Sequence, residues 1–311
     1  MITKDSNIVV LMGGPSTEAE VSRNTGKAVA EALSAIGYKI IPMEYDPRHV
    51  VEDLKSVEAE AVFIALHGKY GEDGTIQSVL ELAGIPYTGS GVTSSAITMD
   101  KIMSSYLFKQ SGLPMAHSKP YFLKDGIETV MDDIKKEFVF PVVLKPACEG
   151  STIGIEIVRN ENNLQAALER VFHVEPRILA EAYLDGDEFT VSVLDGMALP
   201  VIQICPHSGQ YDYHSKYTKG ATDYIVPAPI SDELALQMKC AAEQGYKVAE
   251  CKGAVRFDFK ADKEGRPFIL EANSIPGMTS TSLVPKAAAA AGISFSSLCE
   301  KILLEAGLGK V

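Results

Sequence analysis

The sequence predicts an α/β protein in which a doubly wound parallel sheet domain is followed by two α+β domains. Three observations lead to this prediction. The chain has 311 residues, which exceeds the usual size of a single hydrophobic core. Its first hundred residues alternate short β-branched runs with amphipathic stretches, the pattern of βαβ units. From residue 185 onward apolar and polar residues alternate with period two, which indicates an antiparallel sheet.

The first domain is expected over residues 1–98. The apolar run "NIVVLM" (7–12) is followed by an amphipathic segment over 18–36 that ends at Gly37, a typical helix C-cap. Further short apolar runs, "YKIIPMEY", "AVFIAL" (61–66) and "GIPYTGSG", repeat the alternation of strand and helix. This order predicts a parallel sheet covered by helices.

The second domain is expected over residues 99–183. After a helical stretch over 93–111, the runs "FVFPVVLKP" and "STIGIEIV" are predicted strands joined by a glycine-containing loop. A helix near 161–172 and the strand "RILAEAYL" complete a small α+β unit.

The third domain is expected over residues 184–311. Four runs alternate with period two, with "ADKEGR" as a hairpin turn between the last two: "DEFTVSVL", "MALPVIQIC", "GAVRFDFKA" and "RPFILEAN". Residues 206–229 form a polar, Tyr-rich segment without periodicity. Loops of that length inside a compact domain are usually functional or disordered, and we interpret this one as a functional lid.

Composition narrows the class of function. The 46% hydrophobic and 23% charged residues are typical of globular proteins, and the net charge of -12 disfavours nucleic-acid binding, which needs clustered Lys and Arg. The five cysteines include no C-x-x-C pair, so neither a disulfide framework nor a zinc knuckle is indicated. The sequence also lacks a run of membrane-spanning length and a signal-peptide pattern. We therefore expect a soluble cytoplasmic protein that binds neither nucleic acid nor membrane.

The hairpin around "VRFDFKADKEGRPFILEAN" carries polar residues on one face. Period two places Arg256 and Asp258 on one side of the first strand, and Glu271 and Asn273 on one side of the second. A two-residue turn pairs Asp258 with Glu271 and a four-residue turn pairs it with residue 269, and both registers give a shared face. Two carboxylates and an amide suit Mg²⁺, which completes its coordination with phosphate and water. Arg256 beside them indicates that an anion shares the site.

A solvated sheet face, with charges pairing across the strands, is the alternative interpretation of these residues. The break at Pro276-Gly277, directly after Asn273, favours a functional site because an ordinary strand face does not need it. The same alternation places Leu270 on the opposite, apolar side from Glu271.

The segment "FPVVLKPACEGSTIG" is the second candidate. Lys145 at a strand end, followed by Gly150, Ser151, Thr152 and Gly154, offers a point charge and backbone N-H groups for a phosphate chain. No Walker sequence occurs here, and an ordinary turn is the alternative. Together with the predicted magnesium site, the loop indicates nucleotide binding.

For the other candidates, the residues alone favour an ordinary structural role. Glu181 and Glu188 flank a strand exit, where they are either adenine and ribose contacts or solvated carboxylates. Glu18 follows a strand at a helix N-terminus, where a capping role is the alternative. His67 follows a buried strand in a glycine-rich turn, and Lys101 lies on an amphipathic helix where a surface lysine is the default. The segment "GSGVTS" is not a dinucleotide fingerprint, and H-E-x-x-H and G-x-S-x-G are absent.

Taken in order, several segments resemble the D-alanine-D-alanine ligases of the ATP-grasp superfamily. The similarity runs from about residue 8 to residue 303 through "GGPSTEAEVS", "ALHGKYGEDGTIQSVLELAGIPYTGSGVTSSAITMDK", "FPVVLKPACEGSTIG", "YDYHSKY", "VRFDF" and "LEANSIPGMTSTSLVP". The resemblance implies that the N-terminal α/β domain is followed by a two-domain ATP-grasp unit, with ATP held between the second and third domains. It also implies a homodimer.

The resemblance also implies a reaction and a set of ATP and metal residues. The carboxylate of one D-alanine is phosphorylated by ATP, and the amine of a second D-alanine attacks the acyl phosphate. ATP contacts are implied for Lys101, Lys145, Glu181, Tyr183, Leu184, Glu188 and Leu270. Two Mg²⁺ or Mn²⁺ ions are implied at Asp258, Glu271 and Asn273.

Substrate and catalytic roles follow in the same way. Glu18 is implied to hold the ammonium of the first substrate, Arg256 and the Gly277 N-H to stabilise the oxyanion, and Ser282 to bind the second carboxylate. The remaining implied residues are Ser151 and Tyr217, hydrogen-bonded with Glu18, Lys216 near the phosphate or a carboxylate, and His67 at the substrate. The 206–229 loop is implied to close over this site and exclude water.

Two positions depart from the family pattern: Thr152 stands where a serine is frequent, and Ala182 where many members have a lysine beside adenine. A D-alanine-D-lactate or D-alanine-D-serine ligase is the alternative within the fold, and the Lys216-Tyr217 pair favours an amine acceptor. A non-catalytic ATP-binding regulatory protein is the distant alternative. The polar residues of the hairpin argue against it.

Overall fold

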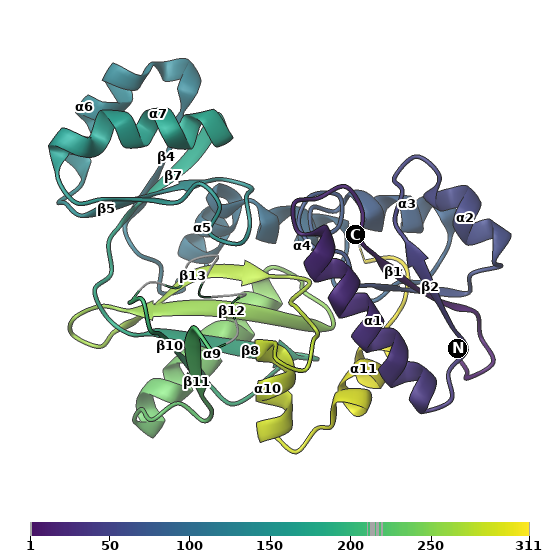
Figure 1. Ribbon diagram of the computed structural model, residues 1–311. Coiled ribbons are helices and arrows are strands. Elements are labelled where there is room, and N and C mark those ends of the chain that lie inside the picture. Colours follow the sequence, from purple (N-terminus) through teal and green to yellow (C-terminus); the bar gives the residue numbers. More distant parts are fainter. Residues whose placement is uncertain (1, 210, 212–214, 216–217, 219, 311) are drawn as a thin grey trace.

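The computed structural model describes residues 2–310 apart from 210, 212–214, 216, 217 and 219. These residues form three sheets with helices packed around them (Figure 1). One sheet falls in each of the ranges 1–98, 99–183 and 184–311, while the domain boundaries themselves stay predictions.

The first sheet is parallel, with the order β2-β1-β3. Its strands are β1 (Ile8–Met12), β2 (Ile40–Glu44) and β3 (Ala61–Ile64), and its helices are α1 (Ala19–Ala35), α2 (Val50–Ser56) and α3 (Thr75–Ala83). All five residues of β1 are buried, as expected for a central strand covered on both faces. The fourth apolar run, "GIPYTGSG", forms isolated bridges from Tyr87 to Val62 and to Gly307 in place of a strand.

The helical stretch expected over 93–111 is two helices, α4 (Val92–Met99) and α5 (Lys101–Gln110). The break is at Asp100, whose extended backbone and side chain start α5. Its carboxylate accepts hydrogen bonds from the N-H groups of Ile102 (2.9 Å) and Met103 (3.1 Å). Lys101 is consequently the first residue of α5 and only 8% exposed, so the default of a surface lysine is wrong.

The second sheet is antiparallel, with the order β4-β7-β5-β6. Its strands are β4 (Ser118–Phe122), β5 (Val142–Pro146), β6 (Glu156–Val158) and β7 (Arg177–Ala182). The helices α6 (Ile127–Glu137) and α7 (Leu164–Val174) cover it, with short 3-10 turns at Leu123–Asp125 and Glu161–Asn163. The sequence did not indicate β4 or α6, because "SKPYF" lacks an apolar alternation.

The third sheet has six strands, ordered β11-β10-β8-β12-β13 with β9 paired to β8. The strands are β8 (Glu188–Leu194), β9 (Met197–Ala198), β10 (Ile202–Pro206), β11 (Thr222–Ile225), β12 (Ala254–Ala261) and β13 (Pro267–Asn273). The helices are α9 (Asp232–Val248), α10 (Leu283–Ala290) and α11 (Phe295–Leu304). The segment 206–229 is thus not wholly irregular, because it contains β11, which pairs antiparallel with β10.

At the predicted site, the β12-β13 hairpin has the strand register expected for a two-residue turn. The turn itself is longer. Asp258 lies opposite Glu271 and Arg256 opposite Asn273. The turn spans 262–266, and a shift of one residue between Asp258 and Phe259 restores the register. Leu270 is the extra residue of this β-bulge.

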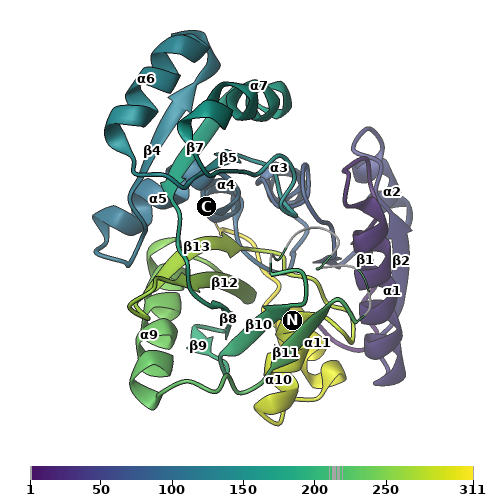
Figure 2. The same ribbon diagram turned by 60° about the vertical axis from the view of Figure 1, so that its left-hand side comes forward.

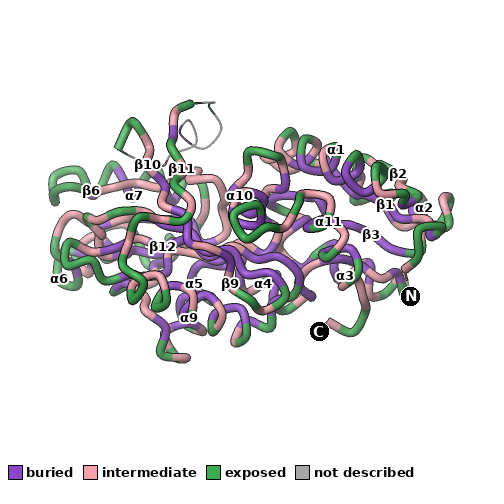
Figure 3. Tube along the Cα trace, turned by 90° about the horizontal axis from the view of Figure 1, so that it is seen from below, coloured by how far each residue is buried: buried purple, intermediate pink, exposed green. Residues whose placement is uncertain are grey.

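The arrangement of the sheets creates an interdomain site. The second domain stands over the β12-β13 hairpin, and the first domain lies beside the third (Figures 1 and 2). One hydrophobic cluster joins Val10 and Leu33 of the first domain to Val284 and Leu303 of α10 and α11. The strands β1, β3 and β12 are largely buried (Figure 3). Polar residues at the carboxyl ends of β1 and β3 therefore face the β12-β13 hairpin.

No single helix among the described residues is long and apolar enough to cross a membrane. The pair α10 and α11 passes the same test only together, with a bend of 106° between them. Several of their apolar residues, including Leu283, Leu298 and Leu303, are buried in the shared core.

Candidate active site

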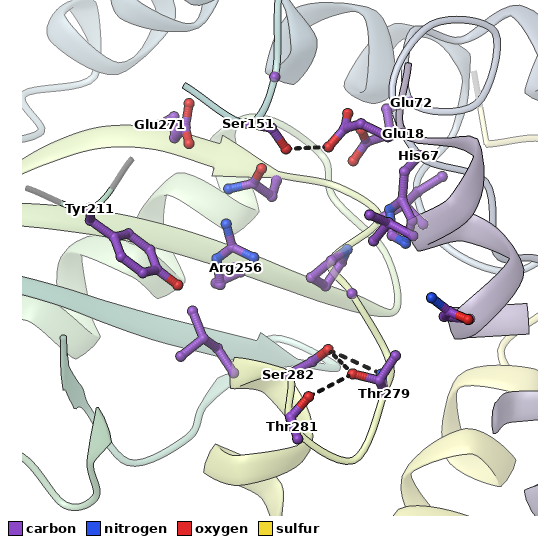
Figure 4. Close-up of a pocket in the computed structure, with 18 of the residues that line it drawn as sticks. Glu18, His67, Glu72, Ser151, Tyr211, Arg256, Glu271, Thr279, Thr281 and Ser282 are labelled. Atoms are coloured by element: carbon purple, nitrogen blue, oxygen red, sulfur yellow. Dashed lines mark hydrogen bonds between the residues drawn. The ribbon is translucent and has the colours of Figure 1, made fainter. Parts of the chain in front are cut away.

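A cavity of about 390 Å³ lies where the first and third domains meet (Figure 4). The carboxyl ends of β1 and β3 supply one wall, and β12, β13 and the turn before α10 supply the opposite wall. Its lining residues include Glu18, His67, Glu72, Gly150, Ser151, Tyr211, Arg256, Glu271, Asn273, Gly277 and Ser282. The structure therefore brings together eight of the residues singled out from the sequence: Glu18, His67, Ser151, Arg256, Glu271, Asn273, Gly277 and Ser282.

Glu18 faces this cavity and does not cap its helix. It occupies the N-cap position of α1, but its side chain makes no capping hydrogen bond. Its carboxylate instead accepts a hydrogen bond from the Ser151 hydroxyl (Figure 4). A Cβ added at Gly68 or Gly150 would lie 3.0 Å from a Glu18 carboxylate oxygen, so a side chain at either position would displace that carboxylate. The predicted Glu18-Ser151 contact is confirmed.

The loop that carries Ser151 has a strained backbone. Ser151 and Thr152 both have positive φ, 51° and 65°, a conformation that non-glycine residues adopt rarely. Strain of this kind costs roughly 1–3 kcal/mol per residue and is retained mainly at functional sites. Here it turns the Ser151 hydroxyl toward Glu18 and across the cavity.

His67 is a buried, neutral side chain in the wall of the cavity. Its Nε2 lies 3.0 Å from the Thr25 hydroxyl, and its ring hydrogen-bonds to the backbone of Ile275. Burial lowers the pKa of His67, and the nearby charge of Glu18 opposes the shift only in part. His67 therefore contributes a hydrogen-bonding group and not a cation.

Glu72 is a site residue that the sequence reasoning missed. Its carboxylate accepts a 2.6 Å hydrogen bond from the Gly68 N-H, and it lines the same cavity as Glu18. Burial, followed by the negative charge of Glu18, raises the pKa of Glu72 to about 8. The only signal available was its place in the "HGKYGEDG" turn after a buried strand.

Asp258 and Arg256 form a bidentate ion pair. The Arg256 guanidinium donates to both Asp258 oxygens at 2.8 Å, and the buried Thr190 hydroxyl donates to one of them at 2.7 Å. Burial alone would lower the pKa of Arg256, but the charge of Asp258 outweighs it and raises the pKa. The shared polar face predicted for the hairpin is confirmed, and Thr190 is a further residue of it that the sequence did not reveal.

A second cavity, of about 440 Å³, lies between the second and third sheets. Its wall contains six of the predicted ATP residues: Lys145, Glu181, Tyr183, Leu184, Glu188 and Leu270. Apolar side chains from β5 and β6 and their loop, Val143, Ile155 and Ile157, complete it. An apolar slot with a few polar groups at its rim suits a purine base and its ribose.

Cations occur along this slot. Lys145 forms a buried ion pair with Glu181, and Lys260 lies 3.7 Å from Glu188. Lys101 lies outside the described cavity wall, but its Nζ donates to the Glu149 carbonyl at 2.6 Å and lies 3.6 Å from Glu271. Lys101 and Lys145 therefore put positive charge near the point where the two cavities approach each other.

Leu270 lies on the same side as Asp258 and Glu271, contrary to the strict alternation predicted. All three line the second cavity. The bulge explains the difference, because one extra residue in β13 interrupts the period of two. The expectation that Leu270 faces the opposite side of the strand is wrong, although its place in the nucleotide cavity agrees with the adenine contact.

The two cavities are adjacent, since Tyr211 and Glu271 line both of them. Tyr211 belongs to the predicted lid, and its hydroxyl lies 3.1 Å from that of Tyr224. Lys216 and Tyr217, also predicted in this lid, lie outside the described residues. Glu271, at the junction, is placed to act on groups held in either cavity.

The residues of the hairpin fit a magnesium site. Among the described residues, no three His, Cys, Asp or Glu side chains form a ready-made metal cluster. Asp258, Glu271 and Asn273 nonetheless lie on one face, with the Asn273 amide 3.2 Å from Asp258. Two carboxylates and an amide oxygen are a typical protein contribution for Mg²⁺ that also binds substrate phosphates.

Comparisons with known proteins identify the family. Two family models match, described as the N-terminus of D-ala D-ala ligase over residues 48–90 and its C-terminus over residues 107–304. A D-alanine--D-alanine ligase from Syntrophotalea carbinolica is 45% identical over 307 residues, covering 99% of this chain and 98% of the relative. The chain belongs to the D-alanine-D-alanine ligase family. A member from Moorella thermoacetica is 44% identical, with 95% and 97% of the two chains covered.

Solved structures agree with this assignment and with the ATP-grasp fold. A D-alanine--D-alanine ligase from Bacillus anthracis, complexed with ATP, has a TM-score of 0.85 at 35% identity and covers 97% and 96% of the two chains. VanG, a D-Ala:D-Ser ligase from Enterococcus faecalis, has a TM-score of 0.82 at 30% identity, with 96% and 98% covered. The chain is thus an enzyme of the ligase family, and the expected fold is confirmed.

Proposed function

We propose that the protein joins two D-alanine molecules to D-alanyl-D-alanine with cleavage of ATP to ADP and phosphate. The adjacency of the two cavities carries this proposal: an apolar slot with lysines meets a polar cavity at Glu271. The polar cavity offers both signs of charge to a bound amino acid, because the Glu18 carboxylate and the Arg256 guanidinium both line it. The names of the relatives support the same reaction.

The first step transfers a phosphoryl group. A carboxylate oxygen of the first D-alanine attacks the γ-phosphorus of ATP, and ADP leaves with the electrons of the broken bond. Glu18 holds the ammonium of this substrate, while Lys101 and Lys145 offset charge on the transferred group, since catalysis of such steps is mainly positioning and electrostatics. Asp258, Glu271 and Asn273 would hold Mg²⁺, which supplies a counter-charge for the phosphates.

The second step forms the amide bond. The neutral amine of the second D-alanine attacks the acyl carbon, an oxyanion develops, and inorganic phosphate leaves, taking up a proton of the amine, as the carbonyl reforms. Arg256 and the Gly277 N-H line the cavity where this oxyanion develops. Ser282 lies at the far end, where its hydroxyl hydrogen-bonds to the Thr279 N-H (3.0 Å) and can take the second carboxylate.

The lid and the cellular context complete the proposal. We place Ser151, Tyr217 and Lys216 at the closure of the site, with residues 206–229 excluding water from the acyl phosphate. We also propose a cytoplasmic homodimer that supplies the dipeptide for peptidoglycan precursors, without nucleic-acid or membrane partners. The depsipeptide D-alanyl-D-lactate and the D-serine product of the VanG relative are the alternatives in acceptor.

ADP release by the purified protein tests the reaction. With D-alanine alone we expect magnesium-dependent release, and with L-alanine none. Addition of D-serine or D-lactate should add little product, as judged by mass spectrometry of the dipeptide or depsipeptide. Absence of ADP release with every one of these substrates would overturn the proposal, and preferential D-alanyl-D-serine formation would reassign the acceptor.

A matched pair of serines tests the acceptor site. Ser282→Ala should raise the KM of the second D-alanine about tenfold and leave the KM of ATP unchanged, because one hydrogen bond to a charged group is lost. Ser280→Ala, two residues away and exposed, is the control and should behave as wild type. Equal kinetics of the two variants would remove Ser282 from the acceptor site.

A further inference from the structure

The C-terminal segment, residues 305–310, crosses from the third domain to the first. It follows α11, and its Gly307 exchanges backbone hydrogen bonds with Tyr87 at 3.2 and 3.3 Å. Tyr87 is fully buried behind β3, where it bridges to Val62. The segment therefore adds a strand-like contact at the edge of the first sheet.

Lys310 fixes the loop after Tyr87. Its Nζ donates to the carbonyls of Tyr87 (2.5 Å) and Gly89 (2.9 Å) and lies 4.5 Å from the centre of the Tyr87 ring. Glu81 of α3 accepts hydrogen bonds from the Gly309 N-H (3.0 Å), the Lys310 N-H (3.1 Å) and the Tyr87 hydroxyl (2.9 Å). Burial lowers the pKa of Lys310 to about 8, so the ammonium is charged at neutral pH.

The other end of the segment fixes the start of β12. Glu305 accepts a hydrogen bond from the Gly253 N-H and shares a hydrogen bond with Asp195. Gly253 packs directly on the loop held by Lys310, because a Cβ added there would lie 3.2 Å from the Gly89 Cα. The Ser90 hydroxyl accepts from the Lys252 N-H at 3.1 Å in the same seam.

This seam joins the two walls of the polar cavity that contains Glu18 and Arg256, called the amino-acid cavity below. Gly253 directly precedes β12, the strand that carries Arg256. On the other side, Gly89, Ile275 and Pro276 line a cavity of only about 30 Å³, so the two domains pack closely there. Glu18 and His67 come from the first domain, whereas Arg256, Gly277 and Ser282 come from the third. The spacing between the two sets depends on how the domains dock along Gly89 and Gly253.

We propose that residues 305–310 are a clamp that sets the spacing of the amino-acid cavity, with Lys310 and Glu81 as its positioning residues. The clamp holds one domain at Gly253 and the other at Tyr87 and Gly89. It does not touch the nucleotide cavity, which lies between the second and third sheets. Loss of the clamp therefore changes D-alanine recognition selectively. This inference rests on the proposed function and deepens it.

Steady-state kinetics of Lys310→Met, Lys310→Arg and the control Lys301→Met test the clamp. Lys301 is an exposed residue of α11. We expect Lys310→Met to raise the KM of D-alanine about tenfold with the KM of ATP unchanged, since small displacements of reacting groups have large effects. Lys310→Arg, which keeps the charge, should restore most of the D-alanine KM, and Lys301→Met should match wild type.

Glu81→Gln provides a second test if Lys310→Met folds poorly, because it weakens the same contacts and leaves Lys310 in place. The same selective rise in the KM of D-alanine is expected. Equal changes in both KM values, or none in either with both variants, would overturn the clamp. Failure of the proposed function is distinguishable, because it would abolish ADP release already in the wild type.

Discussion

Asp258, the proposed metal ligand, is held by polar contacts from three neighbouring side chains. Arg256 takes both of its oxygens, Thr190 donates to one, and the Asn273 amide approaches the other at 3.2 Å. A cation at Asp258 competes with Arg256 for the carboxylate. The two steps of the reaction are thereby linked at one side chain, because the residue proposed for the metal also holds the residue proposed for the oxyanion.

Thr190→Val should weaken metal binding without unfolding the protein. The variant keeps the shape of the side chain but removes the hydroxyl that orients Asp258, and residues behind a metal ligand typically contribute about 10–100-fold to affinity. Titration of Mn²⁺ in the presence of ADP, followed by electron paramagnetic resonance, measures the effect. Ser192→Ala is the control, since the buried Ser192 hydroxyl has no partner among the described residues. Equal Mn²⁺ affinities in both variants would contradict this role of Thr190.

Glu72 should make the stability of the protein depend on pH. Its pKa is raised from 4.5 to about 8, so the native state binds this proton more tightly than the unfolded chain. The free energy of unfolding therefore falls as the pH rises from about 4.5 to 8, by at most roughly 1.4 kcal/mol per pH unit from this group.

Chemical denaturation of Glu72→Gln at pH 5 and pH 8 measures this effect. The variant should lose stability less steeply than wild type between the two pH values. Glu264→Gln, in the exposed hairpin turn, should retain the wild-type slope. A slope unchanged in Glu72→Gln would show that the carboxyl titrates in its ordinary range.

At the scale of elements, the bulge in β13 decides which side chains reach the nucleotide. With the five-residue turn at 262–266 alone, the two strands would pair one residue away from the predicted register. The extra residue Leu270 restores that register, so that Asp258 pairs with Glu271. The correction brings Asp258 and Glu271 together and turns Leu270 into the same cavity. One irregular residue thus allows Asp258 to pair with Glu271 and adds an apolar side chain to the wall of the second cavity.

Leu270→Ala should weaken nucleotide binding alone. Removal of the apolar side chain from the slot is expected to raise the KM of ATP about threefold to tenfold, with the KM of D-alanine unchanged, because roughly 1 kcal/mol of buried apolar contact is lost. Val139→Ala, on an exposed loop before β5, is the matched control. A larger effect on D-alanine than on ATP would contradict the position assigned to the base.

The same elements show what the sequence could and could not predict. The polar face of β12 and β13 was predictable, since period two fixes which residues share a side, whereas the bulge leaves no mark in that pattern. The helix pattern alone favours a surface position for Lys101, because it does not reveal the break at Asp100. Glu72 and Thr190 gain their roles only from tertiary neighbours. The residues alone offered several of the ATP and substrate candidates, the resemblance implied their roles, and most of them line the two cavities.

At the scale of the whole molecule, metal removal should separate activity from stability. Treatment with EDTA should stop ADP release, and excess Mg²⁺ should restore it. The melting temperature of the protein without nucleotide should not change, because the described domains are held by apolar clusters and not by a metal centre. Unfolding caused by EDTA, monitored by circular dichroism, would reveal a structural metal.

The shared core between α1, β1 and the last two helices has a consequence for synthesis of the chain. One face of the first sheet is covered by α2 and α3, which follow soon after β1, and the other by α1, whose packing is completed by α11. At about 5–20 residues per second, α11 is synthesised some 15–60 s after β1. During that interval Val10 and Phe63 lack their final cover. The first domain therefore completes its core only after the third domain has been made.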